Sequence, residues 1–590
     1  MDNYDYGIIG NCQSAALVSK EGSIDWLCLP NFEAGSVFAK ILDDKKGGCF
    51  AIIPEGQYTT QQQYIPRTNI LSTIFKSKEW SFELIDFMPR YHDYNGSYHN
   101  PPDVIRILKP LSGIPKFKIF YDPKINYGEF PTITTLSEDY LKSYSADGAY
   151  ESIYLYSSIP LEVINNQQYY TLEKREFCNL SYNQKIAALY MDNIELELEL
   201  TRTYWMSWVS RGNQFPKYNA EIQRSSLVLK LLSFQNTGAL LAAATTSLPE
   251  TIKDVRNWDY RFCWIRDASM TIRVLNQLGH VNVAERFLNF ILNIIPYKDE
   301  KIQIMYGING QKELPERELS WLAGYQDSKP VRVGNAAYIQ KQNDIYGVLI
   351  DMIYEYLLLY RNNASHNIED LWTVVRTLAR HVINNWTSPD HSIWEFRSNP
   401  QHFTLSKVLC WVALDRGAKI AGLFNKADYA KEWEARSQII KEDILKNGWN
   451  AELGFFTQSY HGTNCDASNL LMEHYGFIDA ADPRYVSTVK KTYENLCKDG
   501  IMFRYINEDD FGKPKSAFTV CTFWMIKSLY RIGDKDLAVE MFENILNQSN
   551  HLGLFSEGLD VESKRLLGNF PQAYSHLALI DLAMVLNGEN

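Results

Sequence analysis

The stretch Asn257-Trp-Asp-Tyr-Arg-Phe-Cys-Trp-Ile-Arg-Asp-Ala-Ser269 holds four aromatic side chains, two arginines and two aspartates. The aromatic rings offer flat apolar faces, and the charged groups offer hydrogen-bond donors and acceptors in pairs. A sugar ring needs both, because its C–H faces stack on aromatic rings and its hydroxyls pair with Asp and Arg side chains. The stretch therefore indicates a sugar-binding loop. The alternative is an ordinary helix start supported by aromatic packing and a salt bridge.

Downstream of Ala220 the apolar residues recur with the period of helices. Segments such as 345–359 and 577–586 are apolar around most of their circumference, so they must be buried. The pattern predicts about twelve helices. They span roughly residues 219–246, 266–279, 281–295, 343–361, 367–386, 404–422, 427–446, 465–475, 485–498, 518–532, 535–549 and 571–587.

The connections between these helices alternate in length. Those after the second, fourth, sixth, eighth and tenth helices have at most about nine residues, and the other six have about 17 to 47. In an array of antiparallel helices every second connection lies at the same end, so all six long connections share one face. Long loops without structure of their own are usually functional. The sequence therefore predicts an (α/α)6 toroid with a site at one end. An open solenoid is the alternative, but it would show internal repeats, and we find none.

The first part of the chain is built differently. Residues 1–199 contain many short β-prone runs, separated by turn signals such as Glu21-Gly22 and Asn95-Gly96, which is typical of an antiparallel β-sandwich. Residues 200–218 are expected to form a helical linker, and residues 219–590 the toroid. The predicted fold class is thus multidomain α and β, with the sandwich first.

Two glutamates in the long connections could carry acid–base chemistry. Glu395 lies between Trp394 and Phe396, and such an apolar setting raises the pKa of a carboxyl group and keeps its proton near neutral pH. Glu557 follows Phe555-Ser556 in the last long connection and could activate a water molecule. Two carboxyls about 6.5–9.5 Å apart would leave room for that water and give inversion. A glutamate beside an aromatic residue is more often a surface residue, so the shared face of the toroid decides in favour of catalysis.

Several motifs resemble glycoside hydrolase family 15, the glucoamylases and their trehalase-like relatives. Trp394-Glu-Phe-Arg397, followed by Pro400-Gln-His-Phe-Thr-Leu-Ser-Lys407, is similar to the region of the general acid. Gly553-Leu-Phe-Ser-Glu557, followed by Gly568-Asn-Phe-Pro-Gln-Ala-Tyr-Ser-His576, is similar to the region of the general base. The opening Gly10–Pro30 resembles the start of bacterial and archaeal members, whose N-terminal domain is a β-sandwich. Its loop Ser23–Pro30 could reach the active site.

The resemblance implies that Glu395 is the general acid and Glu557 the general base. It also implies that Trp264-Ile-Arg-Asp267 and Tyr260 hold the non-reducing glucose, and that Arg504 contacts the sugars beside the bond. At Gly558 the sequence departs from the family pattern, which leaves Asp560 as a second candidate for the base. The complete set of candidates for substrate binding is Tyr260, Trp264, Arg266, Asp267, Arg332, Trp394 and Arg504.

The leading functional expectation is an inverting exo-acting α-glucosidase of the glucan 1,4-α-glucosidase kind, which releases β-D-glucose from a non-reducing end. An α,α-trehalase or an α-1,6-glucosidase on the same scaffold is the alternative within hydrolases. A sugar phosphorylase would need basic or serine-rich groups where Glu557 lies, and a non-catalytic sugar-binding protein would not need both glutamates.

Composition restricts the partners. The chain of 590 residues has a net charge of −11 without a Lys/Arg run, which argues against nucleic acid and anionic membranes. No apolar run approaches the roughly 18 residues of a membrane span, and the N-terminus lacks the regions of a signal peptide. The nine cysteines are scattered without zinc spacing, so we expect reduced thiols in a cytoplasmic protein. We expect an α-glucoside substrate, no metal and no cofactor. The sequence does not indicate an oligomeric state.

Overall fold

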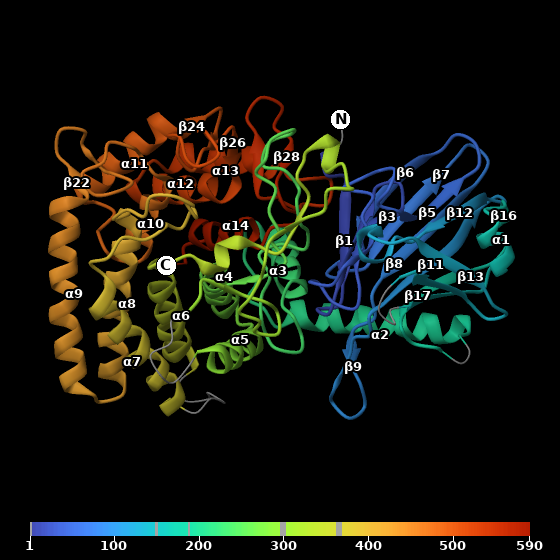
Figure 1. Ribbon diagram of the computed structural model, residues 1–590, viewed down its shortest axis with the longest axis horizontal. Helices are drawn as coiled ribbons and strands as arrows, with labels where there is room; N and C mark the ends of the chain where they lie inside the picture. Colours follow the sequence, from blue (N-terminus) through green and yellow to red (C-terminus); the bar gives the residue numbers. More distant parts are fainter. Residues whose placement is uncertain (1–2, 148–151, 187–188, 296–301, 361–367, 590) are drawn as a thin grey trace.

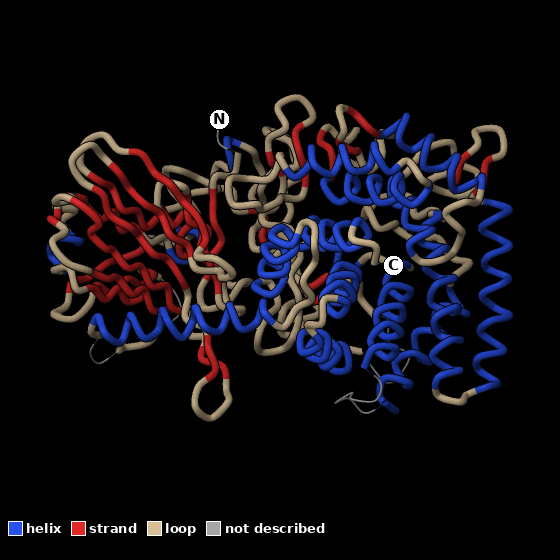
Figure 2. The backbone as a smooth tube through the Cα atoms, turned by 180° about the vertical axis from the view of Figure 1, so that it is seen from behind, coloured by secondary structure: helices blue, strands red, loops and turns tan. Residues whose placement is uncertain are grey.

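A computed structural model describes residues 3–147, 152–186, 189–295, 302–360 and 368–589. Figure 1 shows strands gathered on one side of the molecule and helices on the other, and Figure 2 shows the same division from behind. Residues 361 and 367, which the sequence assigned to the ends of two helices, lie outside the described residues. The predicted fold class, a β-sandwich followed by an (α/α)6 toroid, is confirmed.

Two antiparallel sheets form the sandwich. The first has the order β1-β2-β3-β5-β12-β16, with β4 paired to β3, and the second has the order β13-β14-β15-β17-β11-β8-β7-β6. The strands of the first sheet are β1 (Tyr6–Gly10), β2 (Ala15–Ser19), β3 (Ser23–Cys28), β4 (Ser36–Phe38), β5 (Cys49–Pro54), β12 (Lys116–Asp122) and β16 (Tyr170–Thr171). Those of the second are β6 (Thr59–Tyr64), β7 (Leu71–Lys76), β8 (Ser81–Phe87), β11 (Asp103–Ser112), β13 (Thr132–Leu136), β14 (Leu141–Ser145), β15 (Ser152–Ser157) and β17 (Glu176–Tyr182).

The central strand β11 is buried on both faces. Its Val104 and Leu108 belong to the apolar core between the two sheets. Its Ile105 and Ile107 point the other way, because side chains alternate along a strand, and join the core that continues into the helical part. The second sheet thus connects the sandwich to the toroid through apolar packing.

Helix α2 (Met191–Ser210) runs along the sandwich toward the toroid (Figure 1). It begins before residue 200, where the linker was expected to begin. The next helix, α3 (Asn219–Leu231), is shorter than the predicted segment 219–246. The Ala- and Leu-rich residues 239–246 have the composition of a helix, but they are buried in an extended conformation. There the N–H of Ala242 donates to the carbonyl of Phe262, so tertiary pairing overrides helix propensity.

Six inner helices form a closed ring. In chain order each contacts the next, partly through the 3-10 turn Ala467–Leu470 that precedes α10, and the last helix contacts the first. Closure excludes the open solenoid. The inner helices are α4 (Ile265–Gln277), α6 (Asp344–Tyr360), α8 (Thr404–Leu423), α10 (Leu471–His474), α12 (Thr519–Ile532) and α14 (Ala573–Leu586). The outer helices are α3, α5 (Val281–Ile294), α7 (Ile368–Asn385), α9 (Ala427–Asn447), α11 (Pro483–Leu496) and α13 (Lys535–Leu546).

Inner and outer helices differ in burial as their sequences require. Helix α14 is buried on nearly every side, whereas outer helix α9 buries Trp433, Ser437, Ile440 and Ile444, which form one stripe with helical spacing. The long connections carry short strands that pair with one another, in two cases between different connections. These strands are β18 (Cys263–Trp264), β19 (Met305–Tyr306), β20 (Arg317–Glu318), β21 (Arg332–Val333), β22 (Trp449–Asn450), β23 (Phe455–Phe456), β26 (Ser516–Phe518), β27 (Gly558–Asp560) and β28 (Leu566–Leu567). Within the described ranges, no helix has the length and apolar character of a membrane span.

Candidate active site

A pocket lies at the end of the ring where the long connections meet. Five of the six long connections contribute to it, together with the first turns of α4 and α14. Among the described residues, none before Ala242 lines this pocket, so the sandwich does not enter it. The lining residues are Ala242, Glu250, Arg256, Trp258, Tyr260, Trp264, Arg266, Asp267, Asn335, Ala337, Ile393, Trp394, Glu395, Phe396, Arg397, Arg504, Asp509, Asp510, Phe511, Phe518, Gln572 and Tyr574.

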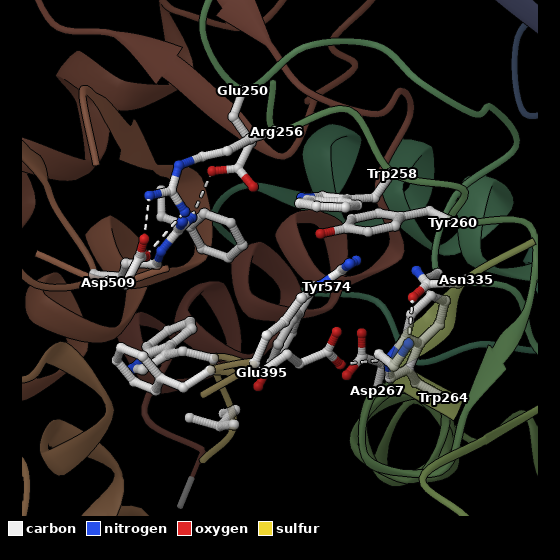
Figure 3. A pocket seen from close by; sticks show the side chains of 18 of the residues that line it. Glu250, Arg256, Trp258, Tyr260, Trp264, Asp267, Asn335, Glu395, Asp509 and Tyr574 are labelled. Atoms are coloured by element: carbon white, nitrogen blue, oxygen red, sulfur yellow. Dashed lines mark hydrogen bonds and ion pairs between the residues drawn. The ribbon is translucent and has the colours of Figure 1, made fainter. Parts of the chain in front are cut away.

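The start of α4 supplies an Arg–carboxylate pair at one side of the pocket. The Nε of Arg266 donates to Oδ1 of Asp267 at 2.8 Å, and its Nη1 donates to Oε1 of Gln342 at 3.0 Å. Burial raises the pKa of Asp267, and the positive charge of Arg266 opposes that rise. Trp264 lies beside this pair and packs edge-on against Tyr260 (Figure 3). This side of the pocket thus combines aromatic faces with bidentate polar groups, as the sequence predicted.

Glu395 projects from the connection between α7 and α8. The indole N–H of Trp264 donates to its Oε1 at 2.7 Å. Burial raises the pKa of Glu395, and the charge of Arg266 opposes that rise. The backbone of Glu395 is left-handed with a φ of 62°, a strained conformation for a residue with a side chain, and such strain concentrates at functional sites. Glu395 is therefore held in place by its contacts and can retain a proton.

Glu557 is 1% exposed and is not itself a lining residue, but it is hydrogen-bonded to Tyr260, which lines the pocket. Its Oε1 accepts a hydrogen bond from the hydroxyl of Tyr260 at 2.6 Å, and its Oε2 accepts one from the backbone N–H of Asn569 at 3.2 Å. Burial, and then the negative charge of Glu250, raise the pKa of Glu557 to about 8, while the donors oppose the rise. Gly568 makes room for this carboxyl, because a Cβ there would lie 2.4 Å from Oε2 of Glu557.

A chain of side chains joins the two glutamates. The hydroxyl of Tyr260 contacts Glu557, the ring of Tyr260 packs on Trp264 with centroids 5.4 Å apart, and Trp264 donates to Glu395. The positions of the two carboxyls are therefore coupled through two aromatic residues of the stretch 257–269.

Asp560 lies outside this arrangement. It is not among the lining residues, and its Oδ1 accepts hydrogen bonds from the N–H and hydroxyl of Ser563. Burial raises the pKa of Asp560, but the hydrogen bonds from Ser563 outweigh this and lower it. Neither carboxyl lines the pocket directly, but Glu557 accepts a hydrogen bond from the lining residue Tyr260, so the geometry favours Glu557 over Asp560.

A second group of charges lies across the pocket from Asp267 (Figure 3). Nη1 of Arg504 donates to Oε2 of Glu250 at 2.8 Å. Arg256 donates to both carboxylate oxygens of Asp509, at 2.9 and 2.6 Å. The sequence predicted Arg504 but missed Glu250, Arg256 and Asp509. All three belong to the long connections, and one sequence does not tell which charged residues of a loop point inward.

Of the predicted binding residues, Trp394 lines the pocket but Arg332 does not. Trp394 lines the pocket, and its indole N–H donates to Oδ1 of Asp466 at 2.9 Å. Arg332 does not line the pocket. Its Nη1 donates to the carbonyls of Val255 and Asn257, and its guanidinium lies 4.6 Å from the ring centre of Trp258. Arg332 therefore supports the loop behind the pocket, and the geometry does not favour its expected contact with substrate.

The β-sandwich contacts the connection between α3 and α4 from outside the pocket. The indole N–H of Trp26 donates to the carbonyl of Ala244 at 2.9 Å, and Nη1 of Arg261 donates to the carbonyl of Ala34 at 2.9 Å. Arg261 also pairs with Asp259 at 2.7 Å, and both side chains are buried. Ser23–Pro30 thus reaches the connection between α3 and α4 through Trp26, but none of its residues lines the pocket.

Comparison with known proteins agrees with this architecture. The family model described as glycosyl hydrolases family 15 matches residues 216–584, and one described as trehalase-like, N-terminal, matches residues 5–173. A protein of Mycobacterium tuberculosis named trehalase is 35% identical over 98% of this chain and 88% of its own length. Trehalase 1 of Sulfolobus acidocaldarius is 36% identical over 97% of both chains.

A solved structure shares the fold. The crystal structure of a bacterial glucoamylase complexed with acarbose superposes with a TM-score of 0.73 at 14% identity, and covers 100% of this chain and 94% of that one. The protein is a glycoside hydrolase in which an N-terminal β-sandwich is followed by a catalytic toroid. The chain belongs to glycosyl hydrolase family 15, whose model matches most of the toroid.

Proposed function

We propose that the protein is an inverting α,α-trehalase. The observation that carries the substrate is the similarity, at 33–36% identity over 96–98% of the chain, to six proteins named trehalase. The sequence alone favoured an α-1,4-glucan and kept trehalose as the alternative. The relatives favour trehalose, and the likeness to a glucoamylase structure concerns the fold alone.

The proposed chemistry rests on the two glutamates. Glu395 protonates the glycosidic oxygen, because burial raises its pKa and so favours the protonated form. Glu557 activates the water in its ionised form. Two hydrogen-bond donors favour that form, but burial and the charge of Glu250 raise its pKa to about 8, so Glu557 acts as a base mainly toward alkaline pH. Inversion then requires no covalent intermediate, and water attacks the anomeric carbon opposite the departing oxygen.

The proposed binding roles follow the two sides of the pocket. Asp267 and Arg266 hold the hydroxyls of the glucose that is attacked, with Trp264 and Tyr260 against its apolar face. Arg504 and Trp394 lie toward the second glucose.

Substrate and reaction type can be tested in one assay. Release of glucose from trehalose, maltose, isomaltose and maltotriose is measured with and without inorganic phosphate. We expect trehalose to be the best substrate and phosphate to have no effect on the products. Preferred cleavage of maltotriose would overturn the assignment of substrate, and formation of a glucose phosphate would overturn hydrolysis.

Stereochemistry tests the mechanism separately. Inversion at one anomeric carbon of trehalose releases that glucose as the β anomer, while the departing glucose keeps its α configuration. Proton NMR in the first minutes should therefore show equal amounts of the two anomers. If only the α anomer is formed at first, the mechanism is retaining, and Glu557 is not a base.

A further inference from the structure

The residues that follow Tyr505 form a short strap across one side of the pocket. Asp509 and Gly512 exchange backbone hydrogen bonds of 3.2 Å, so the chain reverses direction between them. Asp509, Asp510 and Phe511 all line the pocket. This strap, residues 509–512, belongs to the connection before α12.

Arg256 fastens the strap on one side. Besides its two hydrogen bonds to Asp509, its Nη2 donates to the carbonyl of Gly512 at 2.8 Å. The side chains of Arg256 and Asp509 are only 6% and 5% exposed. Breaking a bidentate pair that is this well buried is costly, because it leaves a buried charge without its partner.

The connection that carries Glu395 fastens the strap on the other side. The carboxylate of Asp510 accepts the backbone N–H groups of Arg397 and Ser398 at 2.6 and 3.0 Å. The guanidinium of Arg397 lies 4.4 Å from the ring centre of Trp258 and 5.4 Å from that of Phe511. The strap is therefore clamped between two other long connections and does not hang free.

The strap also completes a charge group that resembles the opposite side of the pocket. Arg256 lies close enough to Glu250 and Arg504 for their charges to interact. Together they present two Arg–carboxylate pairs, where the opposite side presents Arg266 with Asp267. In Figure 3 Glu250, Arg256 and Asp509 face the pocket from one side, and Trp264 and Asp267 from the other. Similar polar groups at both ends suit a ligand that has a complete glucose at each end.

We propose that the strap 509–512, fastened by Arg256, closes the pocket beyond the second sugar and limits the substrate to two glucose units. The proposal rests on the proposed trehalase function, because it takes a disaccharide as the substrate. A further sugar on the second glucose would collide with the strap. Displacing the strap would break the buried Arg256–Asp509 pair, which is costly, so longer substrates are discriminated against.

Substrates of increasing length test this limit. α-Glucosyl fluoride fills only the first sugar site, trehalose fills both, and trehalose with one more 4-linked glucose exceeds both. In wild-type enzyme we expect cleavage of the trehalose bond in the trisaccharide, detected as released maltose, to be at least about 100-fold slower than cleavage of trehalose. Equal rates would overturn the proposal.

Variants of the clamp provide the second arm. In Asp509→Asn and Arg256→Lys, kcat/KM for trehalose should fall about 100-fold, because a buried charge pair loses its geometry. Turnover of α-glucosyl fluoride should stay within about threefold of wild type, which also shows that the variants fold. The preference for trehalose over the trisaccharide should shrink at least tenfold. A parallel loss on both the fluoride and trehalose would overturn the proposal.

Glu508→Gln is the matched control. Glu508 is exposed and precedes the strap, so this variant should match wild type on all three substrates. If the substrate is not trehalose, the result is different: wild-type enzyme would prefer maltose, and the variants would then be compared on maltose and maltotriose. If wild-type enzyme cleaves maltose and maltotriose at equal rates, the proposed limit on substrate length is wrong.

Discussion

The two ends of the helical ring both bury charged side chains, but these charges have different partners. The pocket lies near the first turns of α4 and α14. A second cavity lies near the last turns of the same inner helices and is lined by Arg273, His474, Lys527 and Asp581 among others. There Lys527 lies 2.6 Å from Asp581 and 2.7 Å from Nδ1 of His474. Arg273 lies 2.9 Å from the other ring nitrogen of His474.

Burial raises the pKa of a carboxyl at both ends of the ring, but the net shifts are opposite because the neighbouring charges differ. Burial alone raises the pKa of Asp581, but the adjacent Lys527 charge outweighs it and holds the pKa well below its usual range. At the pocket Glu557 has neutral hydrogen-bond donors and a like-charged neighbour, so its pKa is raised to about 8. Asp581 is thus held in its charged form, whereas Glu557 has a pKa at which it can exchange a proton. The main predictions at the pocket therefore concern activity, and those at the far end concern stability.

The largest effect is expected from Glu557→Gln. The variant keeps the size of the side chain but cannot accept a proton from water, so kcat on trehalose should fall about 1,000- to 10,000-fold. α-Glucosyl fluoride should lose a similar factor, because its hydrolysis also needs an activated water. Steady-state kinetics on both substrates measure this. Retention of most activity on either would show that another group is the base.

Glu395→Gln provides the contrast within the pocket. Fluoride departs with little protonation, so this variant should lose trehalose turnover while keeping much of its activity on α-glucosyl fluoride. Equal losses on the two substrates would contradict the separate roles of Glu395 and Glu557.

Asp581→Asn at the far end should lower stability and leave catalysis unchanged. Removal of the carboxylate leaves the buried ammonium of Lys527 without its opposite charge, which costs about 3 kcal/mol. Urea unfolding at pH 7 would measure the loss, with kcat on trehalose as the second readout. The double variant Asp581→Asn with Lys527→Met should recover part of the stability. A loss of kcat without a loss of stability would mean that the far end takes part in the reaction.

The contrast between the two ends also explains what the sequence could predict. The ring was predictable because alternating connection lengths require the long ones to share a face, and because inner helices such as α14 are apolar all round. Glu395 and Glu557 were recognisable through their apolar neighbours and the family motifs around them. These features depend on local sequence.

Features that depend on distant partners were not predictable. The segment 239–246 reads as a helix, yet it extends because the buried backbone pairs with residues around 262 and 573. Arg332 lies in a long connection as the binding residues do, but its guanidinium turns to the carbonyls of Val255 and Asn257. The pairing of Arg256 with Asp509 joins residues 253 positions apart, and no local pattern indicates it.

A smaller expected effect is that stability depends on pH differently for Glu557 at the pocket and Asp581 at the far end. The pKa of Glu557 is higher in the folded than in the unfolded chain, so its contribution to stability is present below its unfolded value and is lost as pH rises through about 8. Glutamine cannot ionise, so the stability of Glu557→Gln relative to wild type should rise between pH 5 and pH 9. Asp581 has a lowered pKa, so wild type should lose its advantage over Asp581→Asn only in acid. Unfolding curves across this pH range would reveal both trends, and a flat difference for Glu557→Gln would contradict the raised pKa.

The smallest effect is expected at Asp560, three residues beyond Glu557. The family pattern left Asp560 as a rival for the base, but its carboxylate accepts the N–H and hydroxyl of Ser563 in a turn outside the pocket. An asparagine can still accept these hydrogen bonds through its amide oxygen. Asp560→Asn should therefore keep kcat and the pH profile of wild type, and change the free energy of unfolding by no more than about 0.5 kcal/mol. A fall in kcat comparable to that of Glu557→Gln would transfer the role of base to Asp560, and would mean that a carboxyl with a lowered pKa outside the pocket activates the water.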